Sequence, residues 1–209
     1  MTTALRTTQT YPVDSQDRAR ADFYGLLASL FYAAPDAGLL EALAGSGELD
    51  AEASGAEFPA AWRALRRAAA EANAEAVRTE YDETFIGIGK PEVMLYASYF
   101  LSGFLNEKPL VELRSDLAAL GFARNREAKE PEDHLSGLLD VMRQLILDED
   151  SAPADRDAAL QPFFFRHIEP WYGKLCDDLE AAPGADFYRS AAGFLRAFLD
   201  IESEFFRIG

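Results

Sequence analysis

Apolar residues recur along this chain at spacings of three and four, which is the period of one face of an α-helix. The first such run, residues 23–31, follows Asp14 and Ser15, either of which can cap a helix. A second, shorter run can be capped by Asp36 and ends at the glycine cluster 45–47. Runs that alternate apolar and polar residues, as half-buried strands do, are nearly absent.

The middle of the chain predicts two longer helices separated by a loop. The first has Pro59 in its first turn and carries apolar residues as far as Phe85. The sequence Gly-Ile-Gly-Lys-Pro at 87–91 then interrupts the helical pattern. The second, from Met94 to Leu105, is apolar on nearly all sides, so we expect it to lie at the centre of the fold.

The second half of the chain predicts two further helices bounded by Asn, Pro and Gly. Asn106 can cap a helix that has Pro109 at its start and Gly121 just past its end. After the charged loop 124–130, Pro131 opens a helix that carries apolar residues as far as position 146.

A polar stretch, 148–157, is expected to connect the main body to two aromatic-rich C-terminal helices. One of these covers 163–179, with Pro170 as a kink or break, and the other covers 186–206. The whole pattern gives eight to ten helices and no strand. We therefore predict an all-α, single globular multi-helix domain, with residues 1–14 flexible.

Composition supports one domain over residues 1–209, because 49% of the residues are hydrophobic and can form a core. The chain has 36 acidic residues and 20 lysines and arginines, which gives a net charge of −16. This charge argues against binding to nucleic acid, which requires clustered cations, and against an anionic membrane surface. It favours a basic partner.

The sequence indicates a cytoplasmic protein without stable membrane association. The single thiol, Cys176, cannot form an internal disulfide, and the first 20 residues have no apolar core of a secretion signal. No apolar run approaches the length of about 18 residues that a membrane span needs.

Catalytic, metal and cofactor chemistry find little support. Two histidines and one cysteine have none of the spacings typical of metal sites, and acidic neighbours of Cys176 disfavour its thiolate. The 87–90 loop lacks the form of a phosphate-binding loop. We expect no metal, no cofactor and no enzymatic activity. A helical nucleotide-binding or hydrolytic enzyme with this loop at its site is the alternative.

Two groups of residues remain as candidate binding chemistry. One is the sequence Glu-Pro-Glu-Asp-His at 130–134, where a plain helix start explains the proline and the acids but leaves His134 without a reason. The other is an aromatic set that brackets the 87–91 loop and consists of Tyr81, Phe85, Tyr96, Tyr99 and Phe100. Core packing explains Phe85 and Phe100, while a loop between aromatic helices can also form the wall of a peptide groove.

In this order, these segments resemble the TorD/DmsD family of cytoplasmic chaperones for molybdenum redox enzymes, which is related to the NarJ group. The matching pieces are 81–87, then Pro91, Tyr96 and Ser98, then 130–134, then 165–171 with Phe187 and Tyr188. The family pattern is often written Glu-x-Pro-x-Asp-His, and its Glu would fall on Lys129 here; Glu130 or Glu127 can substitute.

The resemblance implies a binding function rather than a reaction. Such chaperones bind the twin-arginine signal peptide and the apo form of an exported molybdopterin oxidoreductase of the dimethyl-sulfoxide-reductase superfamily, and hold it for cofactor insertion before export. The resemblance also implies a peptide-binding region, which consists of Asp133, His134, Glu130, Pro131, Tyr81, Phe85, Tyr96 and Tyr99. By charge, Asp133 is the candidate to bind an arginine. An acidic helical adaptor or assembly subunit is a further alternative for the function. The sequence allows either a monomer or a domain-swapped dimer.

Overall fold

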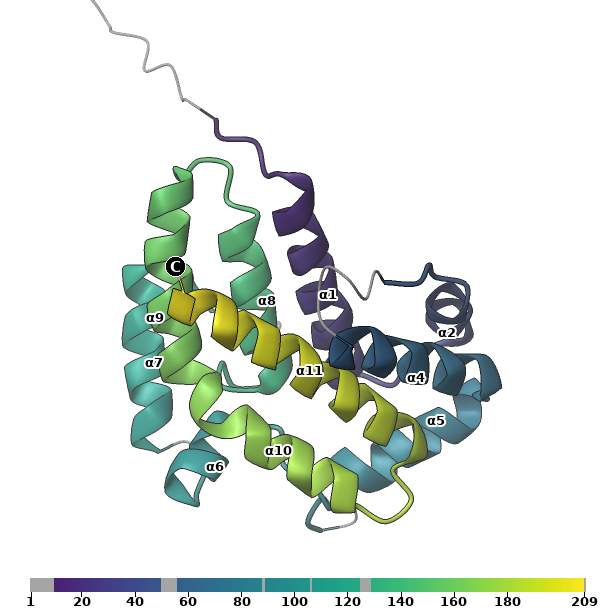
Figure 1. The fold of residues 1–209 in the computed structure, drawn as a ribbon. Helices are drawn as coiled ribbons and strands as arrows, with labels where there is room; N and C mark the ends of the chain where they lie inside the picture. The colour runs from purple at the N-terminus through teal and green to yellow at the C-terminus, as the bar shows by residue number, and fades with distance from the viewer. Residues whose placement is uncertain (1–9, 50–55, 88, 106, 125–128, 209) are drawn as a thin grey trace, which may run out of the picture.

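The computed structural model describes residues 10–49, 56–87, 89–105, 107–124 and 129–208, and these residues form ten α-helices and one π-helix (Figure 1). The helices are α1 (Ser15–Tyr32), α2 (Ala37–Ala44), α4 (Glu57–Glu71), α5 (Ala74–Tyr81), the π-helix η1 (Asp82–Ile86), α6 (Ala97–Ser102), α7 (Lys108–Ala119), α8 (Leu135–Ile146), α9 (Pro153–His167), α10 (Glu169–Ala181) and α11 (Asp186–Ile208). Over these ranges no strand forms, and the predicted all-α class is confirmed.

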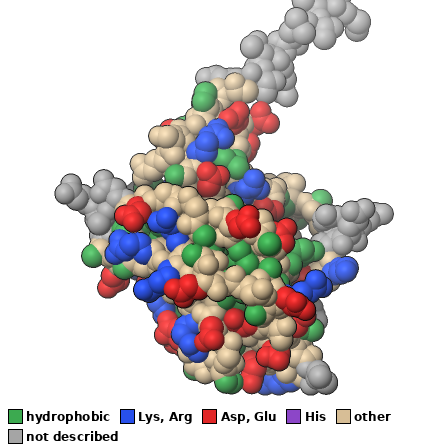
Figure 2. Space-filling model, turned by 90° about the vertical axis from the view of Figure 1, so that its right-hand side faces the viewer, with side chains coloured by type: hydrophobic (Ala, Val, Ile, Leu, Met, Phe, Trp, Pro, Cys, Tyr) green, Lys and Arg blue, Asp and Glu red, His purple; other side chains and the backbone are tan. Residues whose placement is uncertain are grey.

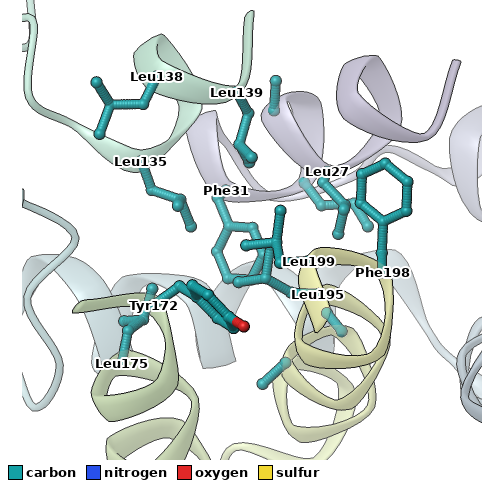
Figure 3. Close-up of a cluster of buried hydrophobic side chains, with 14 of the residues drawn as sticks. Leu27, Phe31, Leu135, Leu138, Leu139, Tyr172, Leu175, Leu195, Phe198 and Leu199 are labelled. Atoms are coloured by element: carbon teal, nitrogen blue, oxygen red, sulfur yellow. The ribbon is translucent and has the colours of Figure 1, made fainter. Parts of the chain in front are cut away.

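The core lies where four helices meet around α11. In Figure 1, α11 crosses the middle of the molecule, with α4 and α10 along its sides, while α1 lies against α8. Figure 3 shows buried side chains from α1, α8, α10 and α11 converging, among them Phe31, Leu139, Leu175 and Leu199. These residues fall on the apolar faces that the periodicity predicts.

Several predicted helix ends are confirmed by their capping bonds. Asp14 accepts a hydrogen bond from the N–H of Asp17 at 2.8 Å, and Asp36 accepts one from Leu39 at 2.8 Å. The expected break at Pro170 is present, because α9 ends at His167 and Pro170 lies in the first turn of α10.

The long helix predicted from Pro59 to Phe85 is wrong, since three elements, α4, α5 and η1, occupy this range. Asn73 interrupts it by adopting extended backbone and capping α5, where its side chain accepts hydrogen bonds from the N–H groups of Glu75 and Ala76. Such side chain-to-backbone bonds make Asn a favourable helix start. The helical periodicity continues through the break and therefore conceals it.

The apolar helix predicted from Met94 to Leu105 is also wrong. Only the six residues of α6 are helical, and Phe104 is 69% exposed at the periphery of the molecule. Gly103 ends the helix in the left-handed conformation, at φ +81°. The apolar residues of this segment therefore have two environments. Those at its start, such as Leu95, are buried, and those at its end, such as Phe104, are exposed.

Two further boundaries differ from the prediction. Pro131 does not open α8, which starts four residues later at Leu135, and half of the polar connection 148–157 is helical because α9 begins at Pro153. The start of α7 fits the prediction at Pro109, while the proposed cap Asn106 lies outside the described residues.

Residues 10–14, which belong to the segment predicted to be flexible, contact the body of the protein. The N–H of Tyr11 donates to the carbonyl of Glu149 at 2.8 Å, and Val13 is buried. Residues 1–9 lie outside the described range. These contacts hold the chain against the α8–α9 connection before α1 begins.

The surface is charged on the face that carries α2, α4 and α5. Figure 2 shows acidic and basic side chains intermingled there, with hydrophobic side chains between them. The net negative charge therefore does not form one continuous acidic patch on this face. The charge at a binding site depends on the residues that line that site. Among the described helices, none has both the length and the apolar character to cross a bilayer.

Candidate functional site

The Glu-Pro-Glu-Asp-His segment is paired with the chain just before α6. Tyr96 and His134 form an isolated antiparallel bridge. On either side of it, the N–H of Ala97 donates to the carbonyl of Asp133 at 3.0 Å and the N–H of Leu135 donates to that of Leu95 at 2.8 Å. The bridge thus joins the two segments that the sequence singles out, at residues that are 38 positions apart in the chain.

Asp133 lies behind this bridge, with only 1% of its surface exposed. Its Oδ2 accepts a hydrogen bond from the N–H of Ser98 at 2.9 Å, in the first turn of α6. Its Oδ1 and the buried Oγ of Ser98 have no hydrogen-bond partner among the described residues. In this structure the carboxylate therefore holds the start of α6 and does not face solvent.

His134 is the N-cap of α8. Its Nδ1 accepts a hydrogen bond from the N–H of Ser136 at 3.2 Å and lies 2.7 Å from the Oγ of Ser136. An accepting Nδ1 carries no proton, and burial lowers the pKa of His134 below its usual value. A neutral imidazole therefore replaces the usual Asn, Asp or Ser of a helix start.

Tyr96 links His134 to Glu130. Its hydroxyl donates to Oε2 of Glu130 at 2.5 Å, and its ring meets the imidazole edge-on at a centroid distance of 5.1 Å. Burial and the Glu130 carboxylate raise the pKa of Tyr96, so the phenol remains protonated and the hydrogen bond persists at neutral pH. Burial, with a further contribution from Glu130, also raises the pKa of Tyr81 to about 12.

An open groove of about 1320 Å³ runs beside this cluster. Its walls come from α1, α7, α8 and the segments at 122–124 and 130–132. The apolar or small lining residues include Ala28, Tyr32, Leu117, Ala118, Phe122, Pro131, Gly137 and Val141. Such a groove has the volume and the mixed lining that suit a segment of another chain.

The charged residues of the groove have both signs. Asp22, Glu130, Glu132 and Asp140 line it together with Arg114, Arg124 and Arg143. Glu132 contacts two of the arginines, and Asp140 lies 3.4 Å from Arg143. Asp22 is exposed on α1, and Glu130 is occupied by a neutral phenol.

The predicted site residues divide into four groups. Glu130, Pro131 and His134 line the groove, whereas Asp133 and Tyr96 lie directly behind them. Tyr81 is buried, and its hydroxyl donates to the carbonyl of Tyr32, a lining residue, at 2.9 Å.

Phe85 and Tyr99 belong to neither the groove lining nor the bridge. Phe85 is buried against Phe31 and Tyr188, at centroid distances of 6.1 and 4.9 Å, which agrees with the core role that the sequence also allowed. Tyr99 packs against Phe100, whose ring stacks on Trp171 of α10.

The 87–91 loop is closed by its own backbone. Gly87 has φ +63°, and a Cβ placed on it would lie 2.7 Å from the carbonyl oxygen of Lys90. The glycine therefore permits a close approach of backbone to backbone, as the reading of this loop as a helix connection requires.

Sequence reasoning missed the contributions of α1 and α7. Asp22, Tyr32 and Arg114 lie on helices whose sequence pattern shows only an apolar face and a polar face. A usable signal existed on α8, where Asp140, Arg143 and Gln144 interrupt an otherwise apolar run at helical spacing. The sequence of one helix does not indicate which other helix its polar face will lie opposite in the folded protein.

Comparison with known families gives this arrangement a context. A family model described as nitrate reductase delta subunit matches residues 51–177, which is more than half of the chain. The chain belongs to the nitrate reductase delta subunit family. The matched region contains both segments of the Tyr96–His134 bridge, and the resemblance to this group of maturation chaperones is confirmed.

Relatives of this family member include proteins named chaperone protein TorD. That of Aliivibrio fischeri is 29% identical over 137 residues, which is 60% of this chain and 62% of the relative. That of Photobacterium profundum is 30% identical over 129 residues, 58% and 59% of the two chains. The chain thus spans about 60% of the length of these curated relatives. They are named as chaperones rather than enzymes.

A solved structure shares the fold. It is described as a redox enzyme maturation protein from Archaeoglobus fulgidus and superimposes with a TM-score of 0.54 at 19% identity. The match covers 91% of this chain and 99% of the other. The all-helical architecture is therefore that of a known solved protein over almost its full length.

Proposed function

We propose that this protein is a cytoplasmic maturation chaperone that binds the twin-arginine signal peptide and the apo form of an exported molybdopterin oxidoreductase. It would hold this partner until cofactor insertion is complete and would perform no catalysis. The family membership and the chaperone names of its relatives support the general role. The finer part depends on the groove.

The observation that carries this proposal is the groove beside residues 130–134. A signal peptide has a cationic start and an apolar core. The groove offers carboxylates from Asp22, Glu130 and Glu132 near apolar surface from Phe122 and Val141. Both parts of such a peptide therefore find matching chemistry within one groove.

Within the proposed binding region, the residues have different tasks. Glu130 and Pro131 would contact the peptide, because they line the groove and are partly exposed, while His134, which is 4% exposed beside them, would fix the start of α8. Asp133 and Tyr96 would hold these residues in place through the bridge, while the remaining aromatic residues, Tyr81, Phe85 and Tyr99, would support the two segments from behind.

The test is calorimetric titration with a synthetic leader peptide that contains an adjacent arginine pair and an apolar stretch of about 12 residues. Val141→Arg places bulk and positive charge in the groove and should abolish measurable binding. Glu130→Gln removes one facing carboxylate and should weaken binding by about three- to tenfold.

Matched controls use residues outside the groove. Val111 is 60% exposed on α7, so Val111→Arg makes the same change away from the lining residues. Glu204→Gln likewise removes a carboxylate from the exposed side of α11. Unchanged affinity in Val141→Arg, with circular dichroism showing intact helices, would contradict the groove as the binding site.

A further inference from the structure

Glu132 of the groove is already occupied by two arginines of the chain itself. Nε and Nη2 of Arg114 donate to its Oε2 at 3.1 and 2.8 Å, and Nη1 of Arg124 lies 3.5 Å from the same oxygen. Arg114 comes from α7, and Arg124 from the segment that follows it. All three residues line the groove.

The two sides of this contact differ in exposure. The side chain of Glu132 is only 14% exposed, whereas those of Arg114 and Arg124 are 47% and 44% exposed. The carboxylate is thus fixed and largely shielded from water. The arginines reach it from the solvent side and can leave it by rotation of their side chains.

This geometry is that of an acceptor prepared for guanidinium. Exchange of one guanidinium for another preserves the forked hydrogen bonds at Glu132 and requires no further desolvation of the carboxylate. Because the guest guanidinium takes the place of Arg114, the shielded carboxylate of Glu132 stays paired, and the exchange costs the fold little. A lysine can offer only a point charge to the same oxygen.

We propose that Glu132 is the residue that selects arginine in the guest peptide, and that Arg114 and Arg124 compete with the guest for it. The inference rests on the proposed function, because it takes the guest to be a cationic leader. The internal arginines then limit affinity and make release of the peptide easier. They also disfavour weakly cationic segments, which cannot displace them.

The experiment measures binding of the arginine-pair peptide to the wild-type protein and to Arg114→Gln, Arg124→Gln and the double variant. Removal of each competitor should tighten binding, by about three- to fivefold for Arg114→Gln. In a Glu132→Gln background the same Arg114→Gln change should give no gain, because the contested acceptor is absent.

A matched control separates this effect from a general change in charge. Arg166 pairs with Asp116 at 2.8 Å and is 60% exposed, outside the groove. Arg166→Gln removes the same charge and should change affinity by less than Arg114→Gln does. A second peptide with two lysines in place of the arginines should show a smaller gain in Arg114→Gln.

The outcomes distinguish the two proposals. If the wild-type protein binds neither peptide, the proposed function fails and this inference fails with it. If the wild type binds but Arg114→Gln binds equally or more weakly, Arg114 is no competitor and the inference alone is overturned. An equal gain in Arg166→Gln, or a gain that persists in the Glu132→Gln background, also overturns it.

Discussion

A neutral imidazole at the start of a helix can perform a task that a charged one cannot. Nδ1 of His134 accepts a hydrogen bond from the backbone of α8, so the proton has to be elsewhere. The macrodipole at a helix N-terminus disfavours a cation, and burial acts in the same direction. His134 is thus explained as a cap, which the sequence alone left open.

This role predicts a pH dependence of stability. Burial lowers the folded-state pKa of His134 below the unfolded value of 6.5, so the unfolded state binds more protons in that window. The free energy of unfolding should fall as the pH drops below about 6.5. Urea denaturation at pH 7.5 and 5.5 measures the difference.

His134→Asn is the matched variant, because asparagine caps a helix and does not titrate. It should retain most of the stability at pH 7.5 and show a smaller loss at pH 5.5. His167 also has a lowered pKa, from burial opposed by Asp116, so part of the dependence should persist. An unchanged pH profile in His134→Asn would exclude His134 as a source.

Two glycines of the 87–91 loop offer a paired test of close packing. Gly87 and Gly89 both have positive φ, at +63° and +100°, but only Gly87 has backbone within reach of an added Cβ. Gly89→Ala should cost about 1 kcal/mol from conformation alone, and Gly87→Ala at least about 1 kcal/mol more. Equal costs, measured by chemical denaturation, would show that the approach to Lys90 is unimportant.

Asp133 tests the difference between holding a site and contacting a ligand. Asp133→Asn keeps an acceptor for the N–H of Ser98 and should leave both stability and peptide affinity nearly unchanged. Asp133→Ala removes the acceptor and should destabilise the protein by about 1–3 kcal/mol. A large loss of affinity in a stable Asp133→Asn variant would instead indicate direct contact with the peptide.

At the scale of elements, α1 and α11 are joined by a buried ion pair. Nε and Nη2 of Arg20 each donate to one carboxylate oxygen of Glu202 at 2.8 Å, and the hydroxyl of Tyr24 donates to Glu202 at 3.0 Å. Glu202 is 2% exposed and Arg20 is 9% exposed. Both charges are thereby removed from water and depend on each other.

Breaking this pair should therefore cost more than replacing it. Glu202→Ala leaves the buried guanidinium without its main partner and should destabilise the protein by about 3–5 kcal/mol. The double variant Arg20→Met, Glu202→Leu removes both charges and should recover most of this loss. Urea denaturation of Arg20→Met, of Glu202→Leu and of the double variant gives the coupling, and additive losses would contradict it.

Helix boundaries show where sequence patterns work. Asp14 and Asp36 mark real helix starts because a capping bond needs only a local side chain and two or three backbone groups. The break at Asn73 escaped prediction because periodic apolar residues continue on both sides of it. The start of α8 at Leu135 also escaped, since residues 131–134 form a turn closed by the N–H of His134 on the carbonyl of Pro131, and His134 is bridged to Tyr96 from another part of the chain.

At the scale of the whole molecule, net charge governs encounter with a partner. The charge of −16 should accelerate association with a cationic peptide, and salt should weaken this attraction. The association rate constant should therefore fall severalfold as ionic strength rises from about 0.05 to 0.5 M, while dissociation changes less. Stopped-flow fluorescence separates the two rates, and a salt-independent association rate would contradict the prediction.

The groove is a property of the whole molecule as well. Its acidic corner at Glu130–His134 was predicted from sequence, but α1 and α7 were not connected to it. Arg114 and Glu132 are 18 positions apart, and their contact exists only because α7 lies beside the segment that leads into α8.

The sequence by itself determined the all-α class, the helix starts capped by Asp14 and Asp36, the acidic character of the protein and the family to which it belongs. These follow from local spacing, local hydrogen bonds and composition, each of which is complete within a short stretch of chain. The tertiary structure alone decided that Asp133 faces inward, that His134 is a cap and that arginines occupy Glu132. Burial and ion pairing depend on which distant surfaces come together, and the period of one segment does not contain that information.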